Sequence, residues 1–532
     1  MIRISHILIC CLFISSCDQS IIDPVHSNPF DKENEETFGD PFQLRAKNYP
    51  DKIRIEWNDI AAESNLQIAG YRLIRKSFST NDTNLISSST MCNYDDSKYC
   101  HDDDSEYLQW DSTYTYKLAA VLETQNEFSI SDEKTIQVTR KIIVGKDSLD
   151  LNIDYSSIKK ALKEIADYYD NNPDSLNLVF DIHVQDTTYF ENNISIQFPV
   201  KLICEVEKQC IIDGEGKQVI FIEELGNSIF SLDTNNVIIS GFTIQNGGGT
   251  NEGGGIKIIG ASPKFVNCDI QNNETEQNGG GVFIEDASPV FFNCNFLNNK
   301  AYGKGGAGYI INSGVEFINC EFSENKAISD PDEDNDGGAL YINNQSDKNI
   351  LISHCIFDAN RAELGPAIYT NNNQSSIIQF SLFVSNISNC DVGVCGTVFF
   401  NEESESILKN VTFTNNQLIG HSPDFSAASI YSKNSTISVV NAILWNDIST
   451  ISEIVGNIDI RYSDINGDTI WVGEGNINAE PLFFISGNVE YELQEGSPCI
   501  NSGTADINSD GLEDLTDYSG TAPDMGCFES PY

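Results

Sequence analysis

Two stretches, FFNCNFLNN (residues 291–299) and VEFINCEFSEN (residues 315–325), are successive copies of one short cassette. In each copy, an aromatic residue follows the cysteine by two positions and an asparagine follows it by five. The spacing is strict over three copies, because Gly254, Gly280 and Gly306 recur every 26 residues and each precedes a cysteine by 14. A repeat this short cannot cover its own apolar edge, so neighbouring units must stack on one another.

The alternation inside each cassette indicates a strand with one buried face, since cysteine and the aromatic residue stand at positions i and i+2. Glycines and asparagine pairs favour positive φ and therefore mark the corners between strands. Equivalent side chains would stack about 4.8 Å apart, which predicts a solenoid of parallel strands with ladders of Asn, Phe and Cys. Four cysteines share one cassette position and are predicted to be buried thiols, although adjacent rungs could cross-link: Cys268, Cys294, Cys320 and Cys355.

The segments GGALYI (337–342) and FSEN (322–325) are similar to repeats of chlamydial polymorphic outer-membrane proteins. The whole repeat region resembles a right-handed parallel β-helix of the pectate-lyase-like class, and the resemblance extends over about six cassettes. It implies an all-β fold, with the β-helix spanning residues 148–485, and a role at a surface. It implies no particular chemistry.

The first 17 residues, MIRISHILICCLFISSC, have one arginine and an apolar run too short to span a bilayer, as in a cleaved export signal. The segment Ile14–Cys17 resembles a bacterial lipobox, which implies lipidation of Cys17; an ordinary signal peptide is the alternative. Residues 18–40 are polar and are predicted to form a flexible tether. We expect an exported protein at the outer membrane or cell surface, held to the membrane only through its lipid.

The chain carries a formal net charge of −48, from 79 Asp and Glu against 31 Lys and Arg. Such a balance argues against nucleic acid, because neutralising phosphates requires clustered cations. A polysaccharide or another cell-surface ligand is the expected partner, and the chain is expected to act as a monomer. Most of the carboxylates are read as a solvated acidic surface.

Residues 41–140 contain short alternating strands separated by polar turns, which predict an antiparallel sandwich. Trp57 in an early strand, with Tyr114 and Tyr116 in a late one, resembles a fibronectin type III domain. These aromatic residues are expected in its core. The module is interpreted as a spacer, with partner binding through its loops as the alternative.

Residues 154–169 predict a helix, because Ile158, Ala161, Leu162 and Ile165 share one face at helical spacing. Ser156 or Ser157 can cap its first turn. A solenoid has an open end that needs a cover, so we interpret this helix as the N-terminal cap of the β-helix.

Residues 486–532 depart from the cassette and are predicted to cap the other end. The phrases GSPCINSGT and DMGCFE resemble the C-terminal segment of bacterial β-helix proteins of the choice-of-anchor Q type, a mostly uncharacterised group. Fifteen cysteines fit an oxidising compartment. Eight of them are predicted to pair by their spacing: Cys92 with Cys100, Cys204 with Cys210, Cys390 with Cys395, and Cys499 with Cys527.

Two acidic segments are candidate calcium sites. In DINSDGLEDLTD, a twelve-residue spacing that resembles an EF-hand or dockerin loop offers the oxygens of Asp506, Asn508, Asp510, Leu512 (through its carbonyl) and Asp517. An acidic surface loop is an equal alternative there, since no amphipathic helix follows. A second insertion contains Asp330, Asp332, Asp334 and Asp336, and a solvated acidic turn is the favoured interpretation of it.

The sequence offers no assembled set of catalytic residues. Lys326 and Arg361 lie by asparagine turns but stand singly, and His183 and His421 are scattered. His354 takes the place held elsewhere by a ladder asparagine. We therefore expect a non-catalytic, lipid-anchored surface protein that binds glycan or mediates adhesion through the β-helix face. The alternative is an envelope-tethered polysaccharide lyase, epimerase or hydrolase, since the fold often hosts these activities.

Overall fold

The computed structural model divides the chain into two compact units, with the boundary between Ile143 and Ser157. It describes residues 42–49, 52–58, 68–77, 83–86, 90–91, 98–103, 112–122, 127–130, 134–138, 141–146, 153–171, 179–224, 237–249, 252–328, 335–373, 375–389, 394–420, 426–447, 451–484 and 491–532. Residues 1–41, which include the predicted signal, Cys17 and the tether, lie outside this set.

The first unit consists of two antiparallel sheets. One has the order β1-β2-β6-β5, with β1 (Arg45–Asn48), β2 (Ile53–Asn58), β5 (Thr90–Met91) and β6 (Lys98–Asp103). The other has the order β4-β3-β7-β8, with β9 paired to β7, and comprises β3 (Ile68–Ser77), β4 (Thr83–Ile86), β7 (Ser112–Leu122), β8 (Glu127–Ile130) and β9 (Lys134–Val138). β10 (Lys141–Val144) follows.

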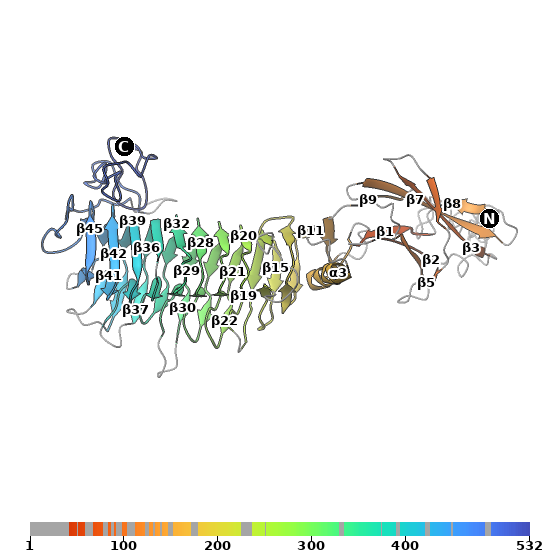
Figure 1. The fold of residues 1–532 in the computed structure, drawn as a ribbon, viewed down its shortest axis with the longest axis horizontal. Helices are drawn as coiled ribbons and strands as arrows, with labels where there is room; N and C mark the ends of the chain where they lie inside the picture. The colour runs from red at the N-terminus through yellow and green to blue at the C-terminus, as the bar shows by residue number, and fades with distance from the viewer. Residues whose placement is uncertain are drawn as a thin grey trace, which may run out of the picture. The chain divides into compact units, whose positions relative to one another are not determined.

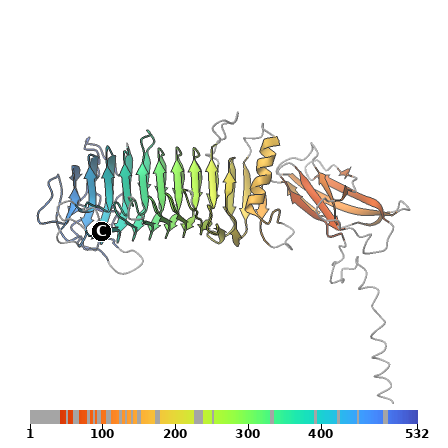
Figure 2. The same cartoon turned by 90° about the horizontal axis from the view of Figure 1, so that it is seen from below.

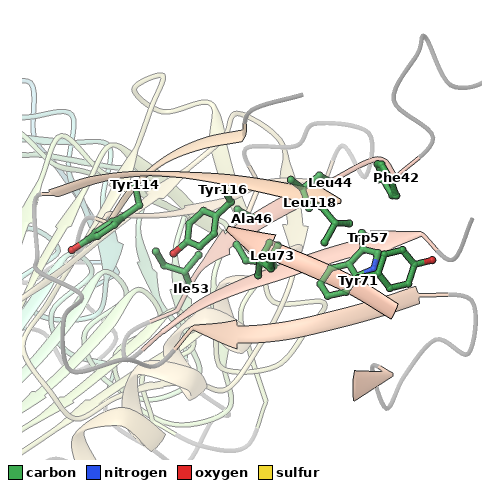
Figure 3. Close-up of a cluster of buried hydrophobic side chains, with 11 residues drawn as sticks. Phe42, Leu44, Ala46, Ile53, Trp57, Tyr71, Leu73, Tyr114, Tyr116 and Leu118 are labelled. Atoms are coloured by element: carbon green, nitrogen blue, oxygen red, sulfur yellow. The ribbon is translucent and has the colours of Figure 1, made fainter. Parts of the chain in front are cut away.

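Side chains from both sheets share one apolar core (Figure 3). Trp57 packs edge-on against Tyr71 with ring centroids 5.6 Å apart. Tyr114 and Tyr116 are 2% and 0% exposed, which confirms that these aromatic residues belong to the core. The finer resemblance to a fibronectin type III domain stays a prediction.

A buried ion pair joins the two sheets of this unit. Arg75 on β3 donates from Nη1 to both carboxylate oxygens of Asp103 on β6, at 2.7 Å each. The hydroxyl of Tyr116 on β7 donates to the same carboxylate at 2.8 Å. Burial, with the adjacent Asp103 carboxylate, raises the pKa of Tyr116 well above its usual value, so the phenol stays protonated and remains a donor.

The second unit is a parallel β-helix in which successive turns of the chain add strands to two sheets and, over the middle coils, to a third (Figure 1). The largest sheet runs through β11 (Phe180–Val184), β12 (Thr188–Phe190), β14 (Val200–Cys204), β15 (Cys210–Asp213), β17 (Ile238–Ser240), β18 (Phe242–Gln245), β20 (Lys264–Val266), β21 (Asp269–Gln271), β24 (Val290–Phe292), β25 (Asn295–Leu297), β28 (Val315–Ile318), β29 (Glu321–Ser323), β32 (Ile350–Ser353), β33 (Ile356–Asp358), β36 (Ser376–Val384), β39 (Glu405–Thr414), β42 (Thr436–Val440), β43 (Ile443–Trp445), β45 (Ile458–Arg461) and β46 (Asp464–Ile465).

The ten-stranded sheet comprises β13 (Ile194–Ile196), β16 (Ile220–Glu223), β19 (Ile256–Ile259), β23 (Val282–Glu285), β27 (Gly308–Ile311), β31 (Leu340–Asn343), β35 (Ile368–Asn371), β38 (Val398–Asn401), β41 (Ala427–Lys433) and β44 (Ser452–Val455). The six-stranded sheet comprises β22 (Glu274–Thr275), β26 (Lys300–Ala301), β30 (Lys326–Ala327), β34 (Arg361–Ala362), β37 (Ile387–Asn389) and β40 (Gln417–Ile419). All these pairings are parallel and in register with the cassette, which confirms the predicted solenoid.

The interior contains the predicted phenylalanine ladder. Phe296 stacks on Phe322 with centroids 4.8 Å apart, and Phe322 stacks on Phe357 at 4.7 Å. The column continues through Phe383 and Phe413. Full burial of such a side chain stabilises a fold by about 1.5–3 kcal/mol, so the recurrence of Phe at this position gives every coil a similar apolar anchor.

A ladder of buried asparagines, which we call the asparagine ladder, runs beside the phenylalanines. Except in the last member, Asn446, each amide Nδ2 donates to Oδ1 of the asparagine one coil further on, at 3.0–3.1 Å, and also to a backbone carbonyl of the preceding coil. Each Oδ1 also accepts the backbone N–H of the preceding asparagine. The members are Asn273, Asn299, Asn325, Asn360, Asn386, Asn416 and Asn446. The side chains thus satisfy polar backbone groups that the corner would otherwise bury unpaired.

The cysteines at the repeated cassette position are free and buried, as predicted: Cys268, Cys294, Cys320 and Cys355. Burial raises the pKa of the Cys294 and Cys355 thiols well above the usual value. They therefore act as small apolar side chains.

The outer corner of the largest sheet places one residue per coil in the left-handed region. Asn267, Asn293 and Asn319 have φ of 54°, 53° and 53°, and His354 has 55° at the equivalent position. His354 is thus confirmed as a substitute for asparagine, and its ring stacks on Phe380 at 4.9 Å. Burial lowers the pKa of His354, which favours a neutral ring.

Helix α3 (Ile158–Asn171) begins four residues after the start of the predicted segment. Ser157 caps it, because its hydroxyl oxygen accepts the Lys160 N–H at 3.2 Å. The Glu191 carboxylate accepts the N–H groups of Ile158 and Lys159, at 3.0 and 2.8 Å. The helix lies across the first strands of the solenoid (Figure 2), as expected of a cap.

The C-terminal segment folds back along the last coils (Figure 1). Cys527 N–H donates to Thr412 Oγ1 at 3.0 Å, and Asn441 donates to the Thr504 carbonyl at 2.9 Å. The segment therefore packs against the outer face of the largest sheet near its C-terminal end.

The predicted bond between Cys499 and Cys527 is wrong, because both thiols are free and buried. Cys499 lies beside Asp464, at 3.2 Å between Sγ and Oδ2, in an apolar cluster with Met525. Cys527 packs in a separate cluster with Leu382 and Val384. Each sulfur fills a different apolar pocket, and proximity to the chain end does not bring them together.

The other predicted disulfides have different outcomes. Cys204 and Cys210 are bonded as predicted. Cys100 and Cys395 are both disulfide-bonded. Their predicted partners, Cys92 and Cys390, lie outside the described residues, so these two pairings stay predictions.

The asparagine ladder ends on a buried carboxyl group, Glu453, which accepts Asn446 N–H and Nδ2 at 2.7 Å each and the Ser429 hydroxyl at 2.5 Å. Burial raises its pKa from 4.5 to about 7, although hydrogen bonds from Ser429 and Asn446 oppose the shift. The folded state therefore holds a proton that the unfolded chain releases above pH 4.5.

We expect the free energy of unfolding to fall as pH rises from 4.5 to 7, by up to about 3 kcal/mol through Glu453. Denaturant unfolding at several pH values should show this loss in the wild type and a flatter profile in Glu453→Gln. Glu316→Gln, which removes an exposed carboxylate, is the matched control and should keep the wild-type slope. An unchanged slope in Glu453→Gln would contradict the assignment.

Candidate functional site

Three cations stand at equivalent positions on successive rungs of the six-stranded sheet. Lys300 pairs in register with Lys326, and Lys326 with Arg361, while Glu274 precedes them on the first rung. Adjacent rungs are about 4.8 Å apart. The side chains at the alternate positions, such as Ala301 and Ala327, are small and buried and point inward. We call Lys300, Lys326 and Arg361 the cation column.

A groove of about 800 Å³ lies at the start of the cation column. Its lining comprises Gly216, Asn246, Gly247, Gly248, Gly249, Asn272, Glu274, Glu276 and Tyr302. A Cβ atom at Gly248 would lie 2.7 Å from the Glu274 carbonyl oxygen, so only glycine allows the chain to pass here. The groove thus has a peptide wall, two carboxylates and one aromatic ring.

Tyr302 is 40% exposed and is held in place by Lys300. Lys300 Nζ donates to the Tyr302 hydroxyl at 2.6 Å, lies 4.0 Å from the ring centroid and pairs with Glu274 at 3.2 Å. Burial acts to lower the pKa of Lys300, but its hydrogen bonds to Tyr302 and Glu274 outweigh this and raise it. The ammonium group is therefore permanently charged at neutral pH, and the ring presents a fixed face to the groove.

The arrangement suits a polar polymer better than an apolar ligand. A fixed aromatic face packs against the C–H groups of a sugar ring, and carboxylates and backbone groups hydrogen-bond to its hydroxyls. Lys326 and Arg361 extend the site along the solenoid axis, where they can pair with anionic groups. Arg361 also donates to Asn389 Oδ1 at 3.2 Å.

A second cluster gathers carboxylates around one lysine on the outer face of the largest sheet. Lys208, in the short loop between β14 and β15 that the Cys204–Cys210 disulfide closes, pairs with Asp269 at 2.8 Å. Burial raises the pKa of Glu321 two rungs further on, and the Asp358 and Asp269 carboxylates add to the shift while Lys208 opposes it. Sequence spacing does not indicate this cluster, because its three carboxylates come from three different coils and Lys208 from a fourth.

The structure places the calcium-loop residues in an exposed turn closed by its own carboxylates. Asp506 Oδ2 accepts the Gly511 N–H at 2.9 Å, and Asn508 Oδ1 accepts the Asp510 N–H at 2.9 Å. The Asp514 carboxylate also folds into the turn, accepting the Ile507 N–H at 2.8 Å. Within the described ranges no group of three or more His, Cys, Asp or Glu side chains is placed to hold a metal ion. Calcium binding at Asp506, Asn508, Asp510, Leu512 and Asp517 stays a prediction.

The second acidic segment is described only in part. Asp330, Asp332 and Asp334 lie outside the described residues. Asp336 is buried and pairs with Lys304 at 3.1 Å, while Lys304 Nζ lies 5.0 Å from the Tyr341 ring centroid. This pair ties the insertion to the ten-stranded sheet, which is a structural role.

The other basic candidates remain separate from the groove. His183 lies 3.9 Å from Glu205 on the largest sheet, and His421 is outside the described residues. In the part of the chain that the structure describes, no helix has the length and apolarity to cross a membrane.

One comparison with known proteins agrees with this architecture. A family model described as a right-handed β-helix region matches residues 211–383. Together with the stacked parallel strands, the match defines the solenoid as a right-handed parallel β-helix.

Three solved structures are similar to the chain. A family 28 exopolygalacturonase from Yersinia enterocolitica is 10% identical, with 82% of this chain and 98% of that chain covered, and a TM-score of 0.22. A pectin methylesterase from carrot is 12% identical, with 60% and 87% covered and a TM-score of 0.26. A pectate lyase from Pectobacterium carotovorum is 11% identical, with 81% and 87% covered and a TM-score of 0.14. No curated protein sequence matches the chain. Likeness at this level carries no information about activity.

Proposed function

We propose that this chain is a lipid-anchored bacterial cell-surface protein that binds acidic glycans without transforming them. The proposal rests on one observation: the cation column of Lys300, Lys326 and Arg361 continues directly from the groove that contains Tyr302. In a chain with 79 acidic and 31 basic residues, this alignment favours a ligand with regularly spaced negative charges, which Lys326 and Arg361 would meet while Lys300 stays paired with Glu274.

In this proposal the aromatic ring, the carboxylates and the cations of the site each contact a different part of the glycan. Tyr302 would stack against one sugar ring, and Glu274 and Glu276 would accept hydrogen bonds from hydroxyl groups. Lys326 and Arg361 would pair with carboxylate or sulfate groups of the following sugars. The acidic remainder of the surface would repel other parts of the polymer, so binding would be confined to this face.

Biolayer interferometry with immobilised polyuronate, sulfated glycan and neutral glucan would test the proposed binding. The wild type should bind the two acidic polymers and lose affinity as salt rises, because exposed charge pairs are screened. Lys326→Gln with Arg361→Gln should weaken binding about tenfold, since each exposed pair contributes up to about 1 kcal/mol. Tyr302→Ala should weaken binding to a similar degree.

Lys264→Gln is the matched control, because Lys264 is an exposed lysine on the outer face of the largest sheet. It should bind like the wild type. Equal affinity of the double variant and the wild type would rule out the cation column as the site. The same titrations with and without calcium test whether the Asp506–Asp517 loop contributes, through a change in affinity or in thermal stability.

The anchor is a separate part of the proposal and rests on the sequence before residue 18. Lipidation of Cys17 would leave the β-helix outside the cell and tethered by residues 18–40. Metabolic labelling with a palmitate analogue should mark the wild type, and Cys17→Ser should abolish the label. A labelled Cys17→Ser variant would exclude this anchor.

A second candidate function, polysaccharide cleavage or epimerisation, is favoured by the cluster around Lys208. A lone cation among carboxylates, one of which has a raised pKa, can supply a base and an acid. New reducing or unsaturated ends released from polyuronate, and lost in Lys208→Ala, would replace the binding-only proposal with this one. Absence of both products, with an unchanged ratio of C5 epimers in the recovered polymer, would leave binding as the function.

A further inference from the structure

A small groove between helix α3 and strand β13 differs in character from the rest of the surface. Its volume is about 470 Å³, within the range of small-molecule sites, and its floor is formed by Leu162 and Phe198. These two side chains are 2% and 5% exposed, so they present carbon atoms to the groove without being free to move out of it. The groove belongs entirely to the β-helix unit.

The rim of this groove is cationic. Lys159, Lys160 and Lys163 line it, and no carboxylate is among its described lining residues. All three lysines are exposed on α3. Three ammonium groups around one small apolar groove are notable in a chain with a net charge of −48.

The acidic groups nearby do not cancel this charge. The Glu191 carboxylate is engaged by the first N–H groups of α3, at 3.0 and 2.8 Å. Lys159 Nζ donates to the Asn192 carbonyl at 3.1 Å, which fixes its position at one end of the rim. Asp167 approaches Lys163 only to 3.9 Å, with both side chains more than half exposed, so this pair is weak. The helix N-terminus is thus already capped, and the charged side chains that line the groove are those of the lysines.

We infer that this groove binds an anionic amphiphile, a carboxylate carrying a hydrocarbon chain. The chain would lie on Leu162 and Phe198, where it removes apolar surface from water, and the head group would pair with Lys160 and Lys163. The cationic rim favours a negatively charged head group, and the apolar floor favours a hydrocarbon chain attached to it. A short polar anion would leave the floor uncovered, and a cationic amphiphile would meet three like charges. The site is independent of the glycan groove.

Isothermal titration calorimetry of the full chain with decanoate, below its micelle concentration, tests the inference. We expect saturable binding of one decanoate per chain, and no binding of acetate or decyltrimethylammonium. Lys160→Gln with Lys163→Gln should weaken decanoate binding about tenfold. Ser195→Trp should abolish it, because Ser195 is an exposed lining residue of β13 and the indole would fill the groove.

Lys217→Gln, at an exposed lysine in a turn of the same unit, is the matched control and should bind like the wild type. Thermal unfolding of each variant establishes that it is folded. If Ser195→Trp does not fold, the lysine variants still decide the question. Any of three results would overturn the inference: no heat with decanoate, equal binding of the cationic amphiphile, or wild-type affinity in the double lysine variant. Binding to phosphatidylglycerol vesicles without binding of monomeric decanoate would likewise replace it with a membrane-surface contact.

Discussion

Replacement of Asn299 by alanine is expected to destabilise the β-helix by about 3 kcal/mol or more, because several buried polar groups would lose partners at once. The Asn299 amide donates to the Ile270 carbonyl and to Asn325 Oδ1, at 2.8 and 3.1 Å. Its Oδ1 accepts both the backbone N–H and Nδ2 of Asn273, at 3.1 and 3.0 Å. Alanine offers none of these bonds, and the site is 0% exposed, so water cannot replace them.

Urea unfolding of Asn299→Ala should show a lower midpoint than the wild type, and hydrogen exchange should locate the weakest protection in β22 to β30. The matched control is Asn295→Ala in the same coil, which removes only a partly buried bond to Asp269. It should cost about 1.5 kcal/mol, because it removes a single bond to a charged group. Similar losses in the two variants would show that the asparagine ladder contributes no more than an outer-face asparagine.

The interior of the solenoid could be predicted from the sequence, because the length of the repeat decides which side chains stack on one another. Where successive coils have 26 residues, Asn273, Asn299 and Asn325 must fall on one line if the coils stack. The aromatic position is fixed by the same argument, since Phe296 and Phe322 stand three residues before ladder asparagines. In a solenoid, residues one repeat apart in the sequence are neighbours in space, so the sequence period predicts the contacts between coils.

One coil is longer than its neighbours, which hid the step from Lys326 to Arg361 in the cation column, whereas Lys300 and Lys326 keep the 26-residue spacing of the cassette. Asn325 and Asn360 are 35 residues apart in sequence, against 26 for the preceding pair, since the segment near Asp336 lengthens the coil. Lys326 and Arg361 therefore looked isolated. A different sequence pattern does predict the column, because each of the three basic residues directly follows a ladder asparagine.

Contacts outside the repeat had no comparable signal. Lys208 reaches Asp269 from a disulfide-closed loop whose backbone is hydrogen-bonded to the next coil, and nothing in the spacing of the two residues indicates this. Cys499 and Cys527 looked like a pair because both lie near the chain end. Their separation follows from how the C-terminal segment folds back over different coils, which depends on packing rather than on local pattern.

Asp103→Ala is expected to destabilise the first unit by about 3–5 kcal/mol, the usual cost of removing one member of a buried ion pair. The substitution would leave the Arg75 guanidinium, which is 4% exposed, without the carboxylate that it meets at 2.7 Å. It would also deprive the Tyr116 hydroxyl of the acceptor at 2.8 Å. Because Arg75 belongs to one sheet and Asp103 to the other, the substitution weakens the packing of the two sheets against each other.

Asp102→Ala is a control supplied by the adjacent residue of the same strand. Asp102 points the opposite way and pairs with Arg54 on the neighbouring strand, at 2.6 and 2.8 Å, and Arg54 holds the pKa of Asp102 below its usual value. Since this pair is about one quarter exposed, its loss should cost less than about 1 kcal/mol. Hydrogen exchange of β6 and β7, measured by mass spectrometry, should therefore rise strongly in Asp103→Ala and barely in Asp102→Ala. Equal exchange in the two variants would mean that solvent reaches the Arg75–Asp103 pair and that apolar packing alone joins the sheets.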